Sequence, residues 1–170
     1  MMRAPRRVWL SGALALAALA STPAAGFCGV ASADPVAPVT TINGSVPPGT
    51  VLPLQDTSTM LDTVQEDGNR LVVWQGVRKA GTRVPIHVHD YGGLTCVLSG
   101  TITDFMEGSE PMTYPAGTCY YMPPHTPMSA ANLGTEDVRL TDTFTLPPGE
   151  PTLTVLEPGW QEWTSADASG

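Results

Sequence analysis

The sequence is poor in positive charge. Only eight of its 170 residues are Lys or Arg, against sixteen Asp and Glu, and the formal net charge is −8. An acidic chain repels phosphate backbones, so nucleic acid is not expected as a partner. The sequence also lacks an internal repeat, a glycine loop that would cradle phosphate, and a G-x-S-x-G nucleophile elbow. Chemistry that depends on a phosphate loop or a nucleophilic triad is therefore not expected.

The first 33 residues have the features of a secretory signal peptide. Three arginines precede an apolar stretch at residues 8–20, which is too short for a comfortable membrane span. Ala31-Ser32-Ala33 then fits an A-x-A cleavage site. We therefore expect a secreted or cell-envelope protein that has no membrane association after cleavage. An uncleaved anchor helix is the alternative.

The mature chain expected from this cleavage is more acidic still and holds two cysteines. Three of the eight basic residues lie in the signal peptide, whereas all sixteen acidic residues follow it, so five against sixteen gives a net charge of −11. In an oxidising compartment, Cys96 and Cys119 either form a disulfide or remain two buried free thiols. The sequence leaves both alternatives open.

No stretch keeps a sustained helical period, and short β-type runs separated by Gly and Pro dominate the chain. We expect an extended N-terminal arm at residues 34–69, one β-barrel domain at 70–148 and a C-terminal tail at 149–170. The candidate strands are residues 70–77, 83–89, 94–99, 101–106, 111–114, 118–122 and 138–146. Many short antiparallel strands in one domain of this size predict an all-β sandwich or barrel.

Two histidines lie in the stretch GTRVPIHVHDYGG, residues 81–93. His87 and His89 are two residues apart on an extended segment, so their side chains share one face, which we expect to be the inner face of the barrel. They are either ligands of a metal ion or interior histidines that make hydrogen bonds around a cavity. Asp104 and Glu107, further along the chain near a turn, are expected to be solvated.

The spacing around these histidines resembles the cupin superfamily, which is built on the motifs G-x5-H-x-H-x3-E-x6-G and G-x5-P-x-G-x2-H-x3-N. The positions that match are Gly81, His87, His89 and Gly100 in the first motif and Gly117, Pro123 and Asn132 in the second. The resemblance covers residues 70–146 and implies a single-domain jelly-roll β-barrel.

Two metal-ligand positions of the family depart from its pattern. The family motifs supply two His and one Glu, then a third His, but this chain has Gly93 in place of the Glu and Met128 in place of the third His. His125 replaces the turn glycine. Without the anionic ligand, two imidazoles and a thioether favour copper, or zinc if His125 or a water completes the site, over iron and manganese. The candidate metal ligands are thus His87, His89, Met128 and His125.

Each of the two added candidates has a simpler alternative. Met128 could serve only to fill the core, and His125 could stand in a solvent-exposed turn.

Two functional hypotheses follow. In the first, a secreted cupin-domain protein binds one metal ion and a small organic molecule in its barrel. If that protein is an enzyme, the resemblance implies a metal-dependent oxidoreductase of the dioxygenase type or an isomerase. In the second, the metal site has degenerated and the barrel is a non-catalytic binding module for a small molecule, or forms a homodimer through an edge strand. The sequence does not identify the substrate or the reaction.

Overall fold

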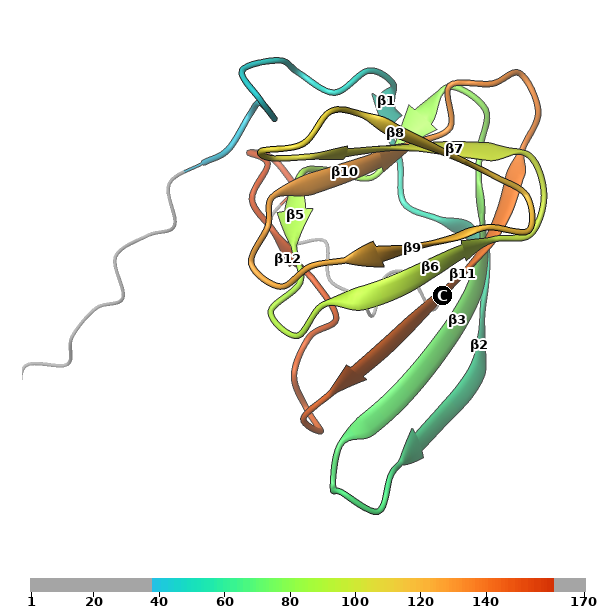
Figure 1. The fold of residues 1–170 in the computed structure, drawn as a ribbon, viewed down its shortest axis with the longest axis vertical. Coiled ribbons are helices and arrows are strands. Elements are labelled where there is room, and N and C mark those ends of the chain that lie inside the picture. The colour runs from blue at the N-terminus through green and yellow to red at the C-terminus, as the bar shows by residue number, and fades with distance from the viewer. Residues whose placement is uncertain (1–37, 161–170) are drawn as a thin grey trace, which may run out of the picture. The chain divides into compact units, whose positions relative to one another are not determined.

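The computed structural model describes residues 38–160, which all belong to the second of two units, Pro35–Gly170. The predicted signal peptide lies outside the described residues. None of the described residues forms a helix of the length and hydrophobicity that crossing a bilayer requires. All regular structure over this range is β-strand, arranged in two sheets (Figure 1). The predicted all-β barrel of jelly-roll type is confirmed.

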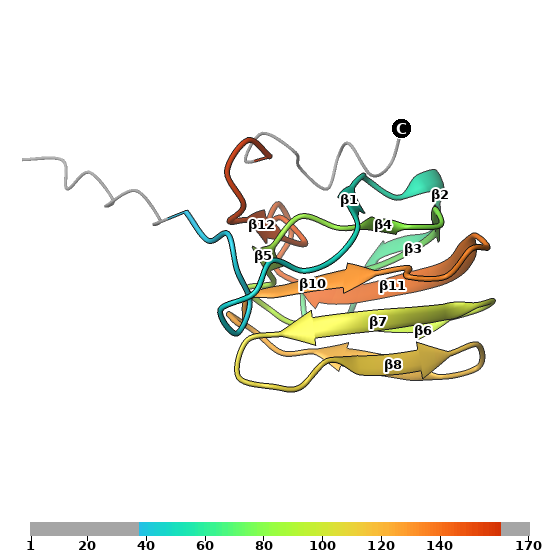
Figure 2. The same cartoon turned by 90° about the horizontal axis from the view of Figure 1, so that it is seen from above.

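The first sheet has seven strands, and it carries the histidine pair. Its order is β1-β4-β10-β5-β12, with β7 pairing both β10 and β8. Figure 2 shows β7, β8 and β10 running side by side on this wall. The strands are β1 (Thr50–Val51), β4 (Thr82–Arg83), β5 (His87–Val88), β7 (Thr101–Met106), β8 (Met112–Pro115), β10 (Met128–Ala131) and β12 (Thr154–Val155).

The second sheet has five strands in the order β2-β3-β11-β6-β9. Its centre is an antiparallel pair of nine residues on each strand, in which Val138 faces Arg78 and Leu146 faces Arg70. The strands are β2 (Gln55–Val64), β3 (Arg70–Arg78), β6 (Gly93–Val97), β9 (Cys119–Met122) and β11 (Val138–Leu146).

The core lies between the two sheets because alternate side chains of each strand point inward. On β3, Val72 and Trp74 are buried, and on β11 the buried side chains are Val138, Leu140, Phe144 and Leu146. Two charged residues also occupy inward-facing positions of these strands. Arg78 is 4% exposed at the end of β3, and Asp142 lies between Leu140 and Phe144 on β11.

Several predicted boundaries differ from the structure. The stretch expected as an extended arm contains the ten-residue strand β2, and the tail contains β12, which pairs with β5. The single strand expected at residues 83–89 is divided into β4 and β5, because Pro85 has no N–H to give to a ladder. The four-residue strand β10 was not predicted.

Cys96 and Cys119 form a disulfide between the neighbouring strands β6 and β9, with a Cα–Cα distance of 4.0 Å. The sequence had left this pairing open. Thr95 and Tyr120, the neighbours of the cysteines along the chain, are buried. The alternation of each strand therefore directs the disulfide away from the barrel interior.

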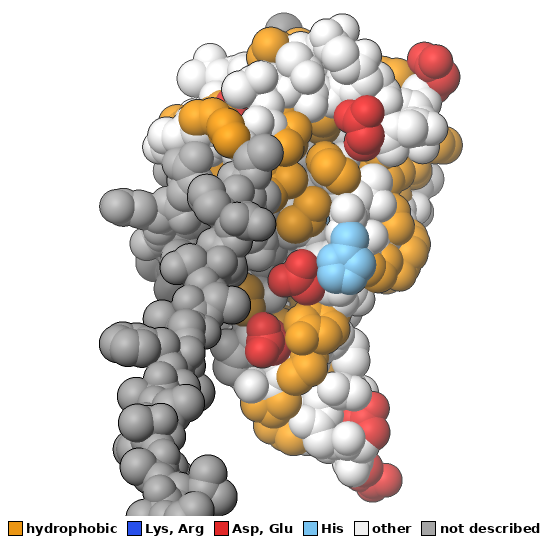
Figure 3. Space-filling model, turned by 90° about the vertical axis from the view of Figure 1, so that its left-hand side faces the viewer, with side chains coloured by type: hydrophobic (Ala, Val, Ile, Leu, Met, Phe, Trp, Pro, Cys, Tyr) orange, Lys and Arg blue, Asp and Glu red, His pale blue; other side chains and the backbone are white. Residues whose placement is uncertain are grey.

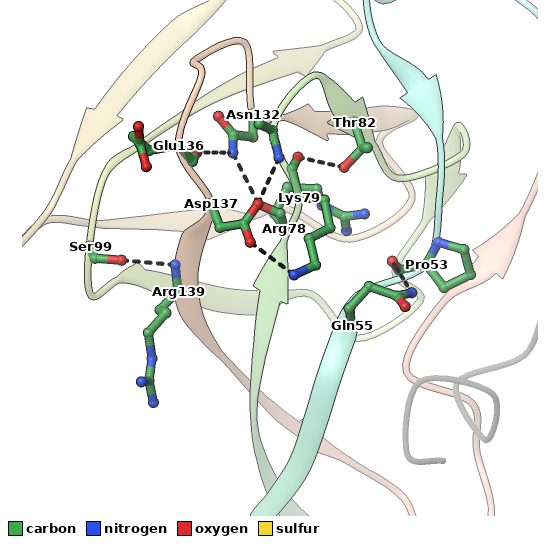
Figure 4. A network of polar contacts seen from close by, with 11 residues as sticks. Pro53, Gln55, Arg78, Lys79, Thr82, Ser99, Asn132, Glu136, Asp137 and Arg139 are labelled. Atoms are coloured by element: carbon green, nitrogen blue, oxygen red, sulfur yellow. Dashed lines mark hydrogen bonds and ion pairs between the residues drawn. The ribbon is translucent and has the colours of Figure 1, made fainter.

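The motif residue Asn132 ties together one end of the barrel. Its side chain donates to the backbone oxygens of Arg78 at 3.0 Å and Glu136 at 2.8 Å (Figure 4). Its Oδ1 accepts a hydrogen bond from Gly134 N. Nearby, Asp137 accepts a hydrogen bond from the Lys79 ammonium at 2.8 Å. This network fixes the end of β3 that carries Arg78.

Candidate functional site

The histidine pair is held inside the barrel by β5 and the residue that follows it. His87 pairs with Met128 of β10 on one side and Val155 of β12 on the other. His87 is 4% exposed and His89 is 2% exposed, so both rings are buried as the alternation predicts. The rings meet edge to face with their centroids 4.7 Å apart.

The hydrogen-bond partners of the two rings fix their tautomers. His87 Nδ1 lies 2.8 Å from the backbone oxygen of Pro85, and His89 Nδ1 lies 2.5 Å from the backbone oxygen of Thr152. A carbonyl oxygen only accepts hydrogen bonds, so each Nδ1 must carry the proton. Each neutral ring therefore has its lone pair on Nε2.

The two unprotonated nitrogens lie close together. His87 Nε2 and His89 Nε2 are 3.1 Å apart. When both rings are neutral, no proton lies between these two acceptors. Two imidazole nitrogens bound at about 2.0–2.1 Å to one ion, at angles between square and tetrahedral, are about 2.9–3.4 Å apart. The observed separation of 3.1 Å lies within this range.

Protonation of either ring is disfavoured. Burial, reinforced by the neighbouring His89, lowers the pKa of His87 to about 3. Burial also lowers the pKa of His89 to about 4, against the hydrogen bond to Thr152. Both rings are therefore neutral at physiological pH, which is the state in which imidazole binds metals.

A cavity of about 60 Å³ lies against the histidine pair. Most of its wall is apolar, and Met128, which is 1% exposed, contributes to the same wall as the two histidines. The structure thus brings together three of the four predicted ligand candidates.

His125 is not among them. Its side chain is 73% exposed, and its Nδ1 lies 3.4 Å from a carboxylate oxygen of Asp90. Its φ of 57° is the left-handed conformation that the turn glycine of the family motif would adopt. Figure 3 shows a face of the molecule on which a histidine stands at the surface beside acidic side chains.

The missing carboxylate position is filled by apolar side chains. A Cβ added to Gly93 would lie 2.6 Å from Phe144 Cε1 and 2.7 Å from Met122 Cε. The Phe144 ring in turn packs on His89, with their centroids 5.1 Å apart. Among residues 38–160, no three His, Cys, Asp or Glu side chains are clustered closely enough to hold a metal ion. The candidate donors beside the histidine pair are therefore its two neutral nitrogens, with Met128 in the same cavity wall.

The cavity also has a polar side that the sequence analysis missed. Arg78, Asp142, Thr95 and Tyr120 all line it. Thr95 Oγ1 donates to Asp142 Oδ1 at 2.5 Å. The sequence contained a sign of this polar side, because Asp142 lies two residues from both Leu140 and Phe144 and therefore points to the same inner face of the strand.

The prediction for Asp104 was wrong. Its side chain is 2% exposed rather than solvated, and neither carboxylate oxygen has a hydrogen-bond partner within the described part of the chain. Asp104 follows Ile102 by two residues on β7 and so shares its inward face. Glu107 is exposed, as predicted.

Comparison with known proteins agrees with this architecture. A family model described as the cupin domain matches residues 73–146. Among solved structures, the chain is similar to the DMSP lyase DddQ from Ruegeria pomeroyi, with 17% identity over 64% of this chain and 53% of that chain, and a TM-score of 0.49. It thus spans about half the length of that lyase.

Two further structures are similar over a larger share of their own length. One is an RmlC-like cupin protein from Methanocaldococcus jannaschii, with 18% identity, coverage of 54% of this chain and 83% of that chain, and a TM-score of 0.44. The other is a conserved protein with a double-stranded β-helix domain from Klebsiella pneumoniae, with 24% identity, coverage of 58% and 84%, and a TM-score of 0.43. No curated protein matches the chain.

The two motifs in register, the two-sheet barrel and the matched family model lead to one conclusion: residues 73–146 of the chain form a cupin domain.

Proposed function

We propose that the protein binds one soft metal ion, copper in preference to zinc, through Nε2 of His87 and Nε2 of His89. The observation that carries this proposal is the 3.1 Å separation of two buried Nε2 atoms, neither of which carries a proton. The carbonyl oxygens of Pro85 and Thr152 orient the rings, which is the role that outer partners play around metal-binding histidines.

The donor set favours a soft ion of low charge. Hard divalent ions such as Mn²⁺ and Fe²⁺ prefer carboxylate oxygen, but Phe144 and Met122 fill the space beside Gly93. Neutral imidazoles suit copper and zinc, and the thioether of Met128 adds a preference for Cu(I). The buried positive charge of Arg78, which lines the same cavity, further disfavours an ion of higher charge.

A metal bound there would act as a Lewis acid or redox centre toward a small molecule in the cavity. The histidines would hold it, and the apolar wall would exclude bulk water. The disulfide between Cys96 and Cys119 supports export to an oxidising compartment. No reaction is assigned, because no residue of the cavity singles one out.

A second candidate function is non-catalytic binding of a small molecule by a metal-free barrel. It is favoured by the same apolar filling beside Gly93, which removes a ligand of the family site. In this alternative, the histidine pair would hold a water or a ligand N–H between its two acceptors.

The test is the metal content of the protein purified without chelator, together with its titration by Cu(I) and Zn²⁺. We expect one equivalent of metal in the wild type and a loss of that equivalent in both His87→Ala and His89→Ala. Met128→Leu should weaken Cu(I) binding more than Zn²⁺ binding, because only the softer ion favours the sulfur.

The matched control is His125→Gly, which removes an exposed histidine and suits the positive φ at that position. It should leave the metal content unchanged. A wild type that binds neither ion would favour the metal-free alternative. Variants of His87 and His89 that bind metal as the wild type does would contradict the proposed site.

A further inference from the structure

The cavity beside the histidine pair is lined by a buried cation that forms no direct ion pair within residues 38–160. Arg78 is 4% exposed and lines the cavity. Its Nη1 donates to the backbone oxygen of Leu52, but its Nε has no hydrogen-bond partner among the residues described. No carboxylate lies within ion-pair distance of its guanidinium in that part of the chain.

The nearest compensating charge does not pair with Arg78 directly. Asp142 lines the same cavity and interacts with Arg78 electrostatically, but its Oδ1 accepts the hydroxyl of Thr95 instead. Burial lowers the pKa of Arg78 to about 10, against the charge of Asp142, so the guanidinium is charged at neutral pH. A buried guanidinium that makes no direct ion pair is costly, and a bound anion that paired with it directly would offset that cost.

The proposed metal ion would add a second positive charge that a bound anion could balance. Two neutral imidazoles and a thioether supply no negative charge, so a cation held by His87 and His89 would leave the cavity with excess positive charge. An anion between the two centres would balance both.

We propose that the cavity binds a small carboxylate whose oxygens accept hydrogen bonds from the Arg78 guanidinium. A planar guanidinium matches a carboxylate in geometry as well as in charge. The contact with Arg78 does not depend on the proposed function. Only a second contact, between the carboxylate and the metal ion, rests on that proposal.

The cavity limits the size of this ligand. A volume of about 60 Å³ is well below the roughly 150 Å³ of an apolar cavity that holds benzene. Molecules the size of acetate or glycolate are therefore expected, rather than aromatic or long-chain acids. Glycolate should bind more tightly than acetate, because its hydroxyl can donate to the Asp142 carboxylate.

The experiment compares acetate, glycolate and acetamide by isothermal titration calorimetry at constant ionic strength in chloride. Acetamide has the size and shape of acetate without its charge. Metal-free and metal-loaded wild-type protein are both titrated. We expect acetate to bind at least about tenfold more tightly than acetamide, the ratio for loss of one charged hydrogen bond.

The variants assign this preference to Arg78. Arg78→Met should weaken acetate binding by about tenfold or more and leave acetamide unchanged, whereas Arg78→Lys should keep most of the preference. Arg139→Met, which removes an exposed arginine, should bind acetate as the wild type does. A thermal unfolding curve confirms that each variant is folded.

The outcomes separate this inference from the proposed function. Equal binding of acetate and acetamide by the wild type would overturn the inference, whether or not metal binds. The same holds for an unchanged preference in folded Arg78→Met. A preference for acetate in protein that takes up no metal would support the carboxylate site and count against the metal site alone.

Discussion

Gly93 stands where the family motif has its carboxylate, and its surroundings explain why no side chain occurs there. The space that a side chain would enter is held by Phe144 and Met122. The φ of Gly93 is not in the left-handed region, so the constraint on this glycine is packing rather than backbone conformation. The packing of the core around Gly93 therefore leaves no room for a carboxylate ligand at this position.

Gly93→Ala should destabilise the protein by about 1–3 kcal/mol, because the new methyl group overpacks the core. Urea unfolding measures the loss. In the double variant Gly93→Ala/Phe144→Leu, the two effects should be less than additive, since the smaller side chain makes room. A Gly93→Ala variant as stable as the wild type would contradict the packing account.

Asp104 is a second residue whose environment sets its behaviour. Burial raises the pKa of its carboxyl from 3.8 to about 7, against a smaller opposing effect of the Phe105 backbone N–H. The folded state therefore holds this proton where the unfolded state has lost it. The stability contributed by the protonated form is full below about pH 4 and is lost as the pH rises through about 7.

Asp104→Asn should reduce the change in unfolding free energy between about pH 4 and pH 8. The wild type should lose at most on the order of 4 kcal/mol between pH 4 and pH 8 through this group, and the variant should lose much less. Denaturant unfolding at the two pH values gives the comparison. An unchanged difference between them in the variant would show that Asp104 is not the group responsible.

At the scale of elements, the C-terminal segment is part of the site. β12 pairs with β5, and the residues before it bring the Thr152 oxygen to His89. Glu157 fastens this segment by accepting from Arg83 Nη1 at 2.6 Å, Arg83 Nη2 at 2.7 Å and Ile86 N at 2.8 Å. The ion pair between Arg83 and Glu157 is largely buried.

Glu157→Gln should cost about 3–5 kcal/mol in unfolding free energy, because it leaves Arg83 buried without its partner. It should also weaken metal binding by about 10- to 100-fold, as loss of the support for a ligand's orientation does. Chemical unfolding and metal titration are the two measurements. Asp62→Asn, which breaks the exposed ion pair with Arg70, is the control and should change metal binding little.

The local sequence pattern predicted the strands and the inward-facing residues better than the contacts between residues that are far apart in the sequence. The motif spacing and the strand alternation predicted the inward histidines, because both depend only on neighbouring residues. The oxygen that orients His89 comes from 63 residues away, and no local pattern predicts such a contact. Arg78 was missed because the predicted strand ended one residue before it.

At the scale of the whole molecule, the barrel combines a neutral nitrogen pair with a buried cation in one small cavity. The jelly roll was predictable because short strands with Gly and Pro at their junctions allow few other folds. The character of the cavity was not predictable, because it depends on how Phe144, Met122 and Arg78 pack across two sheets. The central claim remains that the two Nε2 lone pairs of His87 and His89 form one metal site.

The measurement that tests this claim most directly is the ¹⁵N NMR spectrum of the histidine rings at neutral pH, before and after one equivalent of Cu(I). We predict that both rings carry their proton on Nδ1 in the metal-free protein and that both Nε2 signals shift together on addition of metal, while His125 does not respond. A proton on Nε2 of either buried ring, or Nε2 signals unmoved by the metal, would contradict the account.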